Sequence, residues 1–167
     1  MAESKNCTQN SIRLILATVP DPEVPVLSVL DLGIIREIDC SQEKIRITLT
    51  PTYSGCPAMD VITTSIRMAL LENGIANTEI VTILSPAWTT DWISEEGKQK
   101  LKDYGIAPPH SKQLVCTPEA FQAEEAIQCP RCDSFQTRLI SRFGATPCKA
   151  LYQCENCREP FDYFKCH

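Results

Sequence analysis

The chain has 167 residues, 43% of them hydrophobic, which is enough for one ordinary domain and a small second one. Its net charge of −5 argues against a general nucleic-acid-binding protein. No apolar run is long enough to span a bilayer, and the first ten residues contain no apolar core of a signal peptide. We therefore expect a cytoplasmic protein that uses neither membrane nor nucleic acid. In that compartment its ten cysteines more often bind metal than form disulfides.

The N-terminal part predicts a small domain of mixed helices and strands. Apolar residues at Ile12, Ile15, Leu16 and Val19 have helical spacing, and Pro20 ends that helix. The alternation that follows predicts a hairpin of two strands, at residues 34–40 and 44–50. Further along we expect a helix from Pro57 to Gly74, a strand at 79–84 and a helix from Ser94 to Gly105. Residues 1–105 thus predict an α+β domain.

Acidic residues lie in a proline-bearing segment near the start of this domain. Prolines at positions 20, 22 and 25 predict an extended, rigid path. Asp21, Glu23 and Asp31 in or just after this path could be metal ligands or catalytic carboxylates. They could equally cap turns or remain solvated, which is common turn chemistry.

Cys56 lies on a turn, between Gly55 and the proline that begins a predicted helix. Unpaired N–H groups and the helix dipole at such a position favour a thiolate. A thiolate is what a reactive or metal-binding cysteine requires. The alternative is a small side chain packed under the loop.

Two tryptophans, Trp88 and Trp92, follow the last strand of this domain and could form a partner surface or cover the core. Residues 106–127 are rich in prolines and predict a linker. His110 and Cys116 fall in this linker, where a stable metal geometry is not expected.

The C-terminal residues 128–167 contain two Cys-x-x-Cys pairs, which are Cys129 with Cys132 and Cys154 with Cys157. Two such turns complete a tetrahedral four-sulfur site, which suits Zn²⁺ or iron. About forty residues bury little apolar surface, so a structural metal, most simply zinc, would stabilise this zinc-ribbon module. Three short strands are expected, around residues 137–140, 151–153 and 161–164. Cys148 and Cys166 lie close enough in sequence to replace one of the four ligands.

Motifs that are absent from the sequence exclude several kinds of site. The six glycines are scattered and form no phosphate or dinucleotide fingerprint. The two histidines belong to no His-Glu-x-x-His or Glu-x-x-His motif, so a zinc-protease site and a di-iron site are both excluded. We expect a chain that is not catalytic by itself.

Three motifs of the N-terminal domain resemble the SufT-like iron–sulfur assembly family. They are Asp21-Pro22-Glu23-Val24-Pro25, Asp31-Leu32-Gly33-Ile34 and Gly55-Cys56-Pro57. The resemblance implies an α+β domain whose functional thiol is Cys56. Asp21, Glu23 and Asp60 are the candidates to orient or assist it.

Longer motifs resemble the PaaD family, whose members are accessory subunits of the phenylacetyl-CoA epoxidase system. They are residues 51–58, residues 86–92, and residues 148–152 with 160–166. In that system, part of aerobic phenylacetate degradation, a di-iron oxygenase epoxidises the ring and receives electrons from a reductase with flavin and a 2Fe–2S cluster. The resemblance implies that this chain is part of that system. Because the sequence offers no di-iron site and no flavin or NAD fingerprint, we expect a non-catalytic accessory subunit. Its expected role is to assist iron–sulfur or metal-centre maturation of a partner, especially this iron–sulfur reductase, with a transient iron–sulfur cluster or iron as cargo. The alternative is a zinc-stabilised adaptor that docks oxygenase subunits.

Overall fold

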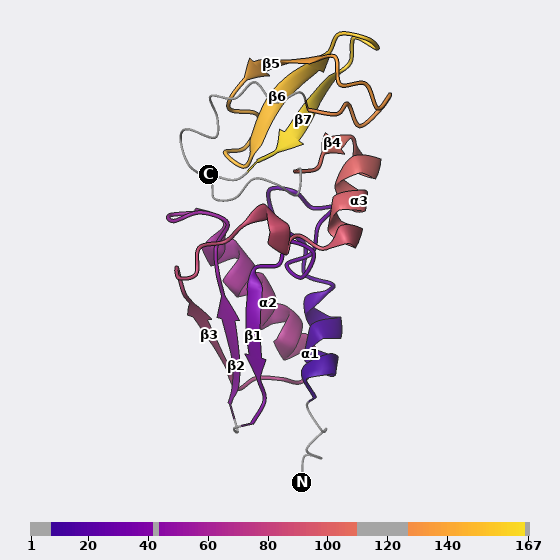
Figure 1. Ribbon diagram of the computed structural model, residues 1–167. Helices are drawn as coiled ribbons and strands as arrows, with labels where there is room; N and C mark the ends of the chain where they lie inside the picture. Colours follow the sequence, from indigo (N-terminus) through magenta and orange to yellow (C-terminus); the bar gives the residue numbers. More distant parts are fainter. Residues whose placement is uncertain (1–7, 42–43, 110–126, 166–167) are drawn as a thin grey trace. The chain divides into compact units, whose positions relative to one another are not determined.

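The computed structural model describes residues 8–41, 44–109 and 127–165 (Figure 1). The chain divides into two compact units, Met1–Trp88 and Thr89–His167. Both units combine helices with a sheet, so the predicted α+β class is confirmed. Within the described ranges, the structure has no helix that is long and apolar enough to cross a membrane.

The sheet of the N-terminal unit has the order β1 (Ile35–Asp39), β2 (Ile45–Leu49), β3 (Thr78–Thr82). Strands β1 and β2 are antiparallel neighbours, as the hairpin prediction requires. Strands β2 and β3 are parallel, because the intervening helix α2 (Met59–Glu72) carries the chain back along the sheet. In β2 the isoleucines and Leu49 are buried while Arg46 is exposed, so the predicted one-sided burial is confirmed.

Helices α1 and α2 supply the other half of this core. Helix α1 (Gln9–Leu16) begins at a capping box between Thr8 and Ser11, and it packs on α2 and β1. Helix α2 lies against the sheet and buries the stripe Ile62, Ile66 and Leu70 (Figure 1). The helical spacing in the sequence therefore identifies the faces that pack.

The segment before β1 is folded rather than simply extended, which corrects the expectation from its prolines. Pro20 forms an isolated antiparallel bridge with Ser28, and the N–H of Asp21 donates to the carbonyl of Leu27 at 2.8 Å. This fold-back buries three apolar side chains, Val24, Leu27 and Val29. Their burial favours a compact loop over an extended strand.

Trp88 is the last residue of the N-terminal unit, and its side chain belongs to the core. Its side chain is 4% exposed, and its indole N–H donates to the carbonyl of Leu32 at 2.8 Å in a buried position. The core interpretation of this tryptophan is therefore confirmed. Trp92 is half-buried and belongs to the short 3-10 helix η1 (Thr90–Trp92) of the second unit.

The C-terminal unit contains helix α3 (Glu95–Tyr104) and four strands. Ser94 caps the start of α3 by accepting from the N–H of Gly97, and Gly105 ends it with φ of 89°, a left-handed conformation that glycine adopts at low cost. The sheet order is β4-β7-β6-β5, in which β4 is Ile106–Ala107, β7 is Pro160–Phe164, β6 is Lys149–Cys154 and β5 is Thr137–Ser141.

Helix α3 and strand β4 fall within the second compact unit, Thr89–His167. Strand β4 pairs in parallel with β7, and Lys102 of α3 forms an ion pair with Asp133 at 2.7 Å. These contacts group α3 and β4 with the ribbon strands. Residues 110–126 of the predicted linker, with His110 and Cys116, lie outside the described residues.

A fragment of residues 1–88 should therefore fold without metal, because it carries its own sheet, both helices and Trp88. Chemical denaturation should show one cooperative transition that EDTA does not change. Trp88→Phe in this fragment leaves the buried Leu32 carbonyl without its donor, so it should cost about 1–3 kcal/mol of unfolding free energy. A non-cooperative transition would mean that residues beyond Trp88 belong to this core.

Candidate metal centre and thiol site

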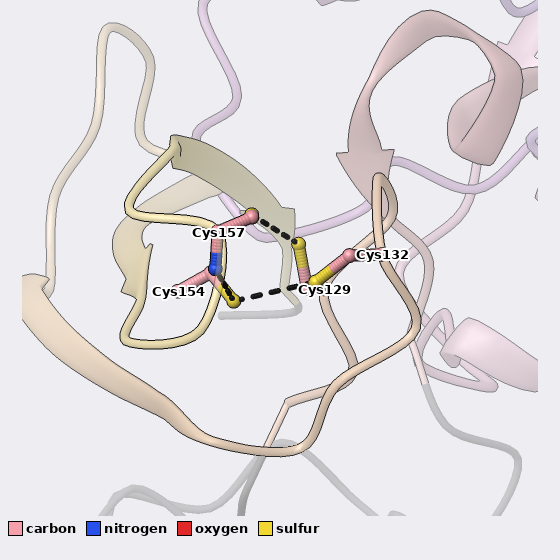
Figure 2. A group of neighbouring side chains, drawn as sticks. All are labelled: Cys129, Cys132, Cys154 and Cys157. Atoms are coloured by element: carbon pink, nitrogen blue, oxygen red, sulfur yellow. Dashed lines mark hydrogen bonds between the residues drawn. The ribbon is translucent and has the colours of Figure 1, made fainter.

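The sulfur atoms of Cys129, Cys132, Cys154 and Cys157 gather in the C-terminal unit (Figure 2). All four lie within 4.8 Å of one another. The Cys129 and Cys157 sulfurs are 3.8 Å apart, and those of Cys132 and Cys154 are 3.5 Å apart. Each close pair joins the two Cys-x-x-Cys turns, so the structure brings together the four cysteines that the sequence predicts.

The two turns are built in the same way. The residue before each first cysteine is a glutamine, and its side-chain amide spans the turn. Gln128 donates to the carbonyl of Asp133, and Gln153 donates to the carbonyl of Arg158, both at 3.2 Å. Neither glutamine was among the residues predicted from the sequence. The repeated Gln-Cys dipeptide was the signal that could have identified them.

Backbone conformation completes the likeness between the turns. Asp133 and Arg158, each directly after a second cysteine, have φ of 58° and 68°. The N–H of Cys129 donates to the carbonyl of Ser134 at 2.9 Å, and that of Cys154 donates to the carbonyl of Glu159 at 3.0 Å. Each turn therefore reverses the chain tightly and points both sulfurs to the same side.

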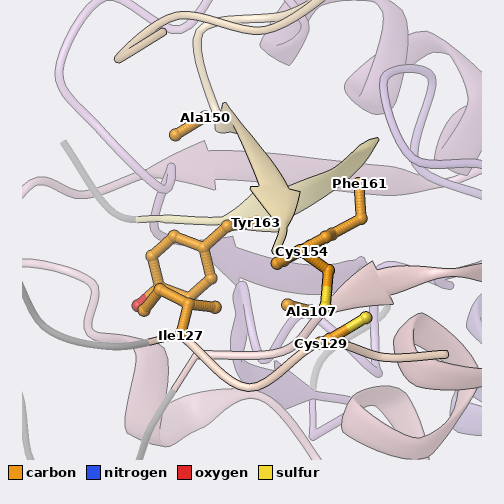
Figure 3. Packing of buried hydrophobic residues seen from close by; sticks show 7 residues of the cluster. All are labelled: Ala107, Ile127, Cys129, Ala150, Cys154, Phe161 and Tyr163. Atoms are coloured by element: carbon orange, nitrogen blue, oxygen red, sulfur yellow. The ribbon is translucent and has the colours of Figure 1, made fainter. Parts of the chain in front are cut away.

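Two members of the four-cysteine cluster, Cys129 and Cys154, belong to the core of this unit (Figure 3), and Cys132 and Cys157 pack against it. Cys129 and Cys154 are fully buried, whereas Cys132 and Cys157 are half-buried. The buried residues packed with them come from β4, β6, β7 and the start of the ribbon, and they are Ala107, Ile127, Ala150, Phe161 and Tyr163. Tyr152 adds a stacked contact to Phe161, with ring centroids 5.9 Å apart. The sulfur cluster and the apolar core are thus one structure.

The thiols influence one another electrostatically. The backbone N–H of Cys157 donates to the Cys154 sulfur and is the main cause that lowers the pKa of Cys154 to about 7. At Cys157 the backbone N–H of Glu159 also lowers the pKa. Desolvation and the neighbouring cysteine sulfurs have a larger combined effect and raise the pKa of Cys157 to about 12. Burial also raises the pKa of Cys129. The four thiols therefore do not all ionise at neutral pH without a cation that replaces their protons.

The geometry fits a four-sulfur metal site. A tetrahedral zinc with Zn–S bonds of about 2.3 Å would have sulfur–sulfur separations of about 3.8 Å. The observed 3.8 and 3.5 Å separations are close to that value. These four residues could hold Zn²⁺ or another thiophilic ion.

The two other cysteines of this region do not belong to the cluster as described. Cys148 is buried at the start of β6, where its carbonyl accepts from the N–H of Lys165 at 2.9 Å. Its sulfur is not a member of the four-sulfur group. Cys166 lies outside the described residues.

Cys56 lies in the N-terminal unit, on the loop between β2 and α2. Gly55 precedes it with φ of 84°, a conformation that a side chain would strain. The N–H of Cys56 donates to the carbonyl of Tyr53, and its carbonyl accepts from the N–H of Met59, the first residue of α2. The predicted position just before a helix is therefore correct.

The electrostatics of Cys56 differ from the expected preference for a thiolate. Burial is the main cause that raises the pKa of the Cys56 thiol, and the negative charges of Glu23 and Asp21 raise it further. The backbone N–H of Ala58 and the side chain of Tyr53 act in the opposite direction without outweighing these causes. These causes together favour the neutral thiol of Cys56 over the thiolate.

The acidic residues named from the sequence have different surroundings. Asp21 is buried and accepts from the N–H of Glu23, and both carboxylates act on Cys56. Asp31 accepts from the backbone and the hydroxyl of Ser28 at 2.9 and 2.7 Å, as a turn-capping residue does. Asp60 is exposed on the first turn of α2 and is not among the charges that shift the pKa of Cys56.

Comparison with known families assigns a class to each unit. Residues 9–82 match the family described as "Iron-sulfur cluster assembly protein", and residues 115–165 match the "PaaD zinc beta ribbon domain". The class is thus an iron–sulfur-assembly-type domain followed by a zinc β-ribbon. The whole chain is 48% identical, over 94% of its length and 92% of the relative's, to the D component of the "Putative 1,2-phenylacetyl-CoA epoxidase" of Escherichia coli (strain K12). The chain belongs to this PaaD family of epoxidase components.

Shorter proteins resemble the N-terminal part. A "Fe-S protein maturation auxiliary factor" of Porphyromonas gingivalis is 36% identical over 56% of this chain and 90% of its own length. The crystal structure of a DUF59 domain from Bacillus anthracis superposes with a TM-score of 0.52 at 25% identity, over 56% of this chain and 90% of that one. The N-terminal fold therefore also occurs as a separate protein.

The ribbon should lose its metal when a cluster cysteine is changed. Cys129→Ser and Cys154→Ser remove buried sulfur ligands, so protein purified without oxygen should bind far less metal and lose the folded C-terminal unit. Elemental analysis and near-ultraviolet circular dichroism measure these two effects. Cys148→Ala is the matched control and should keep about one metal ion per chain, the stoichiometry of a closed four-thiolate site. Full metal binding by the serine variants would contradict the ligand set.

The thiol of Cys56 should react slowly with iodoacetamide. Because its pKa is raised, its thiolate fraction at about pH 8 is below that of an ordinary cysteine, and the rate should rise as pH increases. Glu23→Gln removes a negative charge and should accelerate the reaction, whereas Glu72→Gln at the end of α2 should not. Peptide mass spectrometry follows the residue-specific rate. An unchanged rate in Glu23→Gln would contradict the electrostatic contact.

Proposed function

We propose that this chain is a non-catalytic accessory subunit that assists iron–sulfur or other metal-centre maturation in the phenylacetyl-CoA epoxidase system. The observation that carries the proposal is Cys56, whose thiol lies within electrostatic reach of Asp21 and Glu23. All three residues fall within the segment that matches the iron–sulfur cluster assembly family. The 48% identity to an epoxidase component connects this chemistry to that system.

As a single thiol, Cys56 is suited to bind a metal cargo transiently. Among the described residues, the only group of three or more metal-ligating side chains within 4.8 Å is the four-cysteine cluster. The Cys56 region therefore offers one thiol, and the partner would supply the remaining ligands. A ferrous ion or a cluster edge would displace the thiol proton, and the carboxylates of Asp21 and Glu23 would balance the incoming positive charge.

The four-cysteine cluster has a separate, structural role in this proposal, with zinc as its metal. Four thiolates with no open position suit a structural zinc rather than a catalytic one. Cys129 and Cys154 are fully buried in the core of the unit, so the ion would stabilise the fold and would not exchange with cargo. Zinc in the ribbon and cargo at Cys56 would then be independent of each other.

The iron–sulfur reductase is the proposed recipient. The PaaD family resemblance implies a system in which the reductase carries a 2Fe–2S cluster. Thiolates are the protein ligands of such clusters, so a cysteine donor matches this recipient in ligand chemistry. The di-iron site of the oxygenase would require carboxylate and histidine ligands instead.

A second candidate function is a zinc-stabilised adaptor that docks other components of the epoxidase. One observation favours it: large apolar side chains are exposed along β5 of the ribbon, among them Leu139 and Ile140. In an adaptor these side chains would contact a partner, and Cys56 would have no role in transfer.

The change Cys56→Ser separates the two functions. If Cys56 transfers cargo, cells with this variant should lose growth on phenylacetate, and their reductase should contain less iron and sulfide. The purified variant should remain folded and keep its zinc, because the ribbon site has its own four ligands. Iron, acid-labile sulfide and zinc are measured on the purified proteins. Cys40→Ser, at a half-buried cysteine directly after β1, is the matched control and should behave as wild type.

Normal growth of Cys56→Ser cells with a fully loaded reductase would refute the maturation role and leave the adaptor. Loss of growth with a fully loaded reductase would also refute transfer to that protein. In that case the oxygenase iron content would show whether the di-iron protein is the recipient.

A further inference from the structure

Strand β5 forms one edge of the C-terminal sheet and buries none of its side chains. The strand order β4-β7-β6-β5 leaves β5 paired with β6 on one side only, among the described strands (Figure 1). All five residues from Thr137 to Ser141 are exposed or half-exposed, whereas β6 buries two residues and β7 buries three. The strand thus adds little to the core of its own unit.

The apolar residues of β5 continue a row that begins in this core. Phe161 of β7 pairs with Tyr152 of β6, and Tyr152 pairs with Leu139 of β5. The row runs from a buried phenylalanine, through a half-buried tyrosine, to a leucine that is 43% exposed. A register shift after Leu139 interrupts the alternation of the strand, and Ile140 is also exposed at 48%. An added strand would extend this row by one apolar residue.

An aromatic side chain follows the strand and is held in place. Phe143 is 66% exposed, yet the ammonium group of Lys165 lies 4.4 Å from the centre of its ring. That ammonium also donates to the carbonyl of Arg142, which anchors the turn after β5. A fixed, exposed aromatic ring loses little side-chain entropy when a partner covers it.

The charge along this edge has one sign. Residues 135–143 contain Arg138 and Arg142 and no acidic side chain. Arg138 is exposed and is oriented by a 2.6 Å hydrogen bond to the side-chain oxygen of Gln153, its neighbour across the ladder. The basic residues Arg138 and Arg142 therefore lie on either side of the exposed apolar pair Leu139 and Ile140 in the sequence of this edge.

We propose that β5 accepts an added strand from another component of the epoxidase system, and that this strand alternates apolar and acidic residues. Its apolar residues would extend the row that ends at Leu139, and its carboxylates would lie beside Arg138 and Arg142. Backbone hydrogen bonds to the free edge of β5 supply affinity, and the alternating side chains supply selectivity. This docking rests on the proposed association with other epoxidase components, which the maturation and adaptor functions both require, and it does not depend on Cys56.

A second copy of this chain fits the edge less well. Pairing of two β5 strands would place four guanidinium groups in one short ribbon without a carboxylate between residues 135 and 143. Like charges across a ladder are destabilising. An acidic strand instead offsets the charge that this edge carries.

The test uses the full-length, zinc-loaded chain with the purified oxygenase and reductase proteins. Hydrogen exchange should show slower exchange of the backbone amides of residues 137–141 in the complex, which side-chain docking alone would not produce. The pair Arg138→Glu and Arg142→Glu should weaken binding at least about tenfold, because the acidic strand would then meet like charges. Leu139→Asp should weaken it similarly.

The matched controls carry the same kinds of substitution in the N-terminal unit. Arg67→Glu on α2 and Leu14→Asp on α1, an exposed leucine, should bind like the wild type. Zinc content and thermal unfolding verify that each ribbon variant is folded. Cys56→Ser should also bind like the wild type, so that docking and maturation can fail separately. Unchanged exchange at 137–141, unchanged affinity of the arginine variants, self-association through β5, or no complex with either protein would each overturn the proposal.

Discussion

The C-terminal unit depends on the convergence of four cysteine sulfurs at the centre of its small core. Two of them are fully buried, and the apolar residues around them come from strands at both ends of the segment. In each turn a glutamine side-chain amide and a residue in the left-handed conformation hold the backbone in place. The sulfur positions therefore need little adjustment to surround a tetrahedral ion. The ribbon segment of about forty residues that carries these cysteines buries little apolar surface of its own. A metal that joined both turns would add to the stability of this segment and would leave outer surfaces such as β5 available for other roles.

Most of the secondary structure was predictable because local patterns and tertiary packing agree. The alternation in β2, the stripe Ile62, Ile66 and Leu70, and the glycine at the end of α3 each specify an element and its buried face. The four cysteines were predictable for a similar reason, since their spacing encodes a turn and the turn encodes the ligand geometry. The crossover through α2 follows from the order of strand, helix and strand, although the parallel pairing of β2 with β3 is visible only in the structure.

Features that depend on contacts between distant residues were not predictable. The fold-back around Val24 and Leu27 depends on the burial of these side chains, which the proline pattern in the sequence does not indicate. Strand β4 has only two residues and acquires its identity from β7, about fifty-five positions later in the sequence. The pKa of Cys56 is raised partly by carboxylates more than thirty residues away in sequence, whereas the local rule about helix starts predicts the opposite direction. A raised pKa makes this thiol less prone to oxidation, because the thiolate is the reactive form.

The likeness of the two cysteine turns has a consequence for how the metal centre forms. Each turn is closed by its own hydrogen bonds and presents two sulfurs, so each could act as a bidentate chelating arm. The hairpin of β5 and β6 lies between the arms and closes the 21-residue interval that separates them in sequence. Closing a flexible loop of that length would otherwise cost about 3 kcal/mol in chain entropy. An ion captured by one arm would then lie near the second arm wherever this hairpin has formed, and binding to both arms would stabilise the fold of the unit.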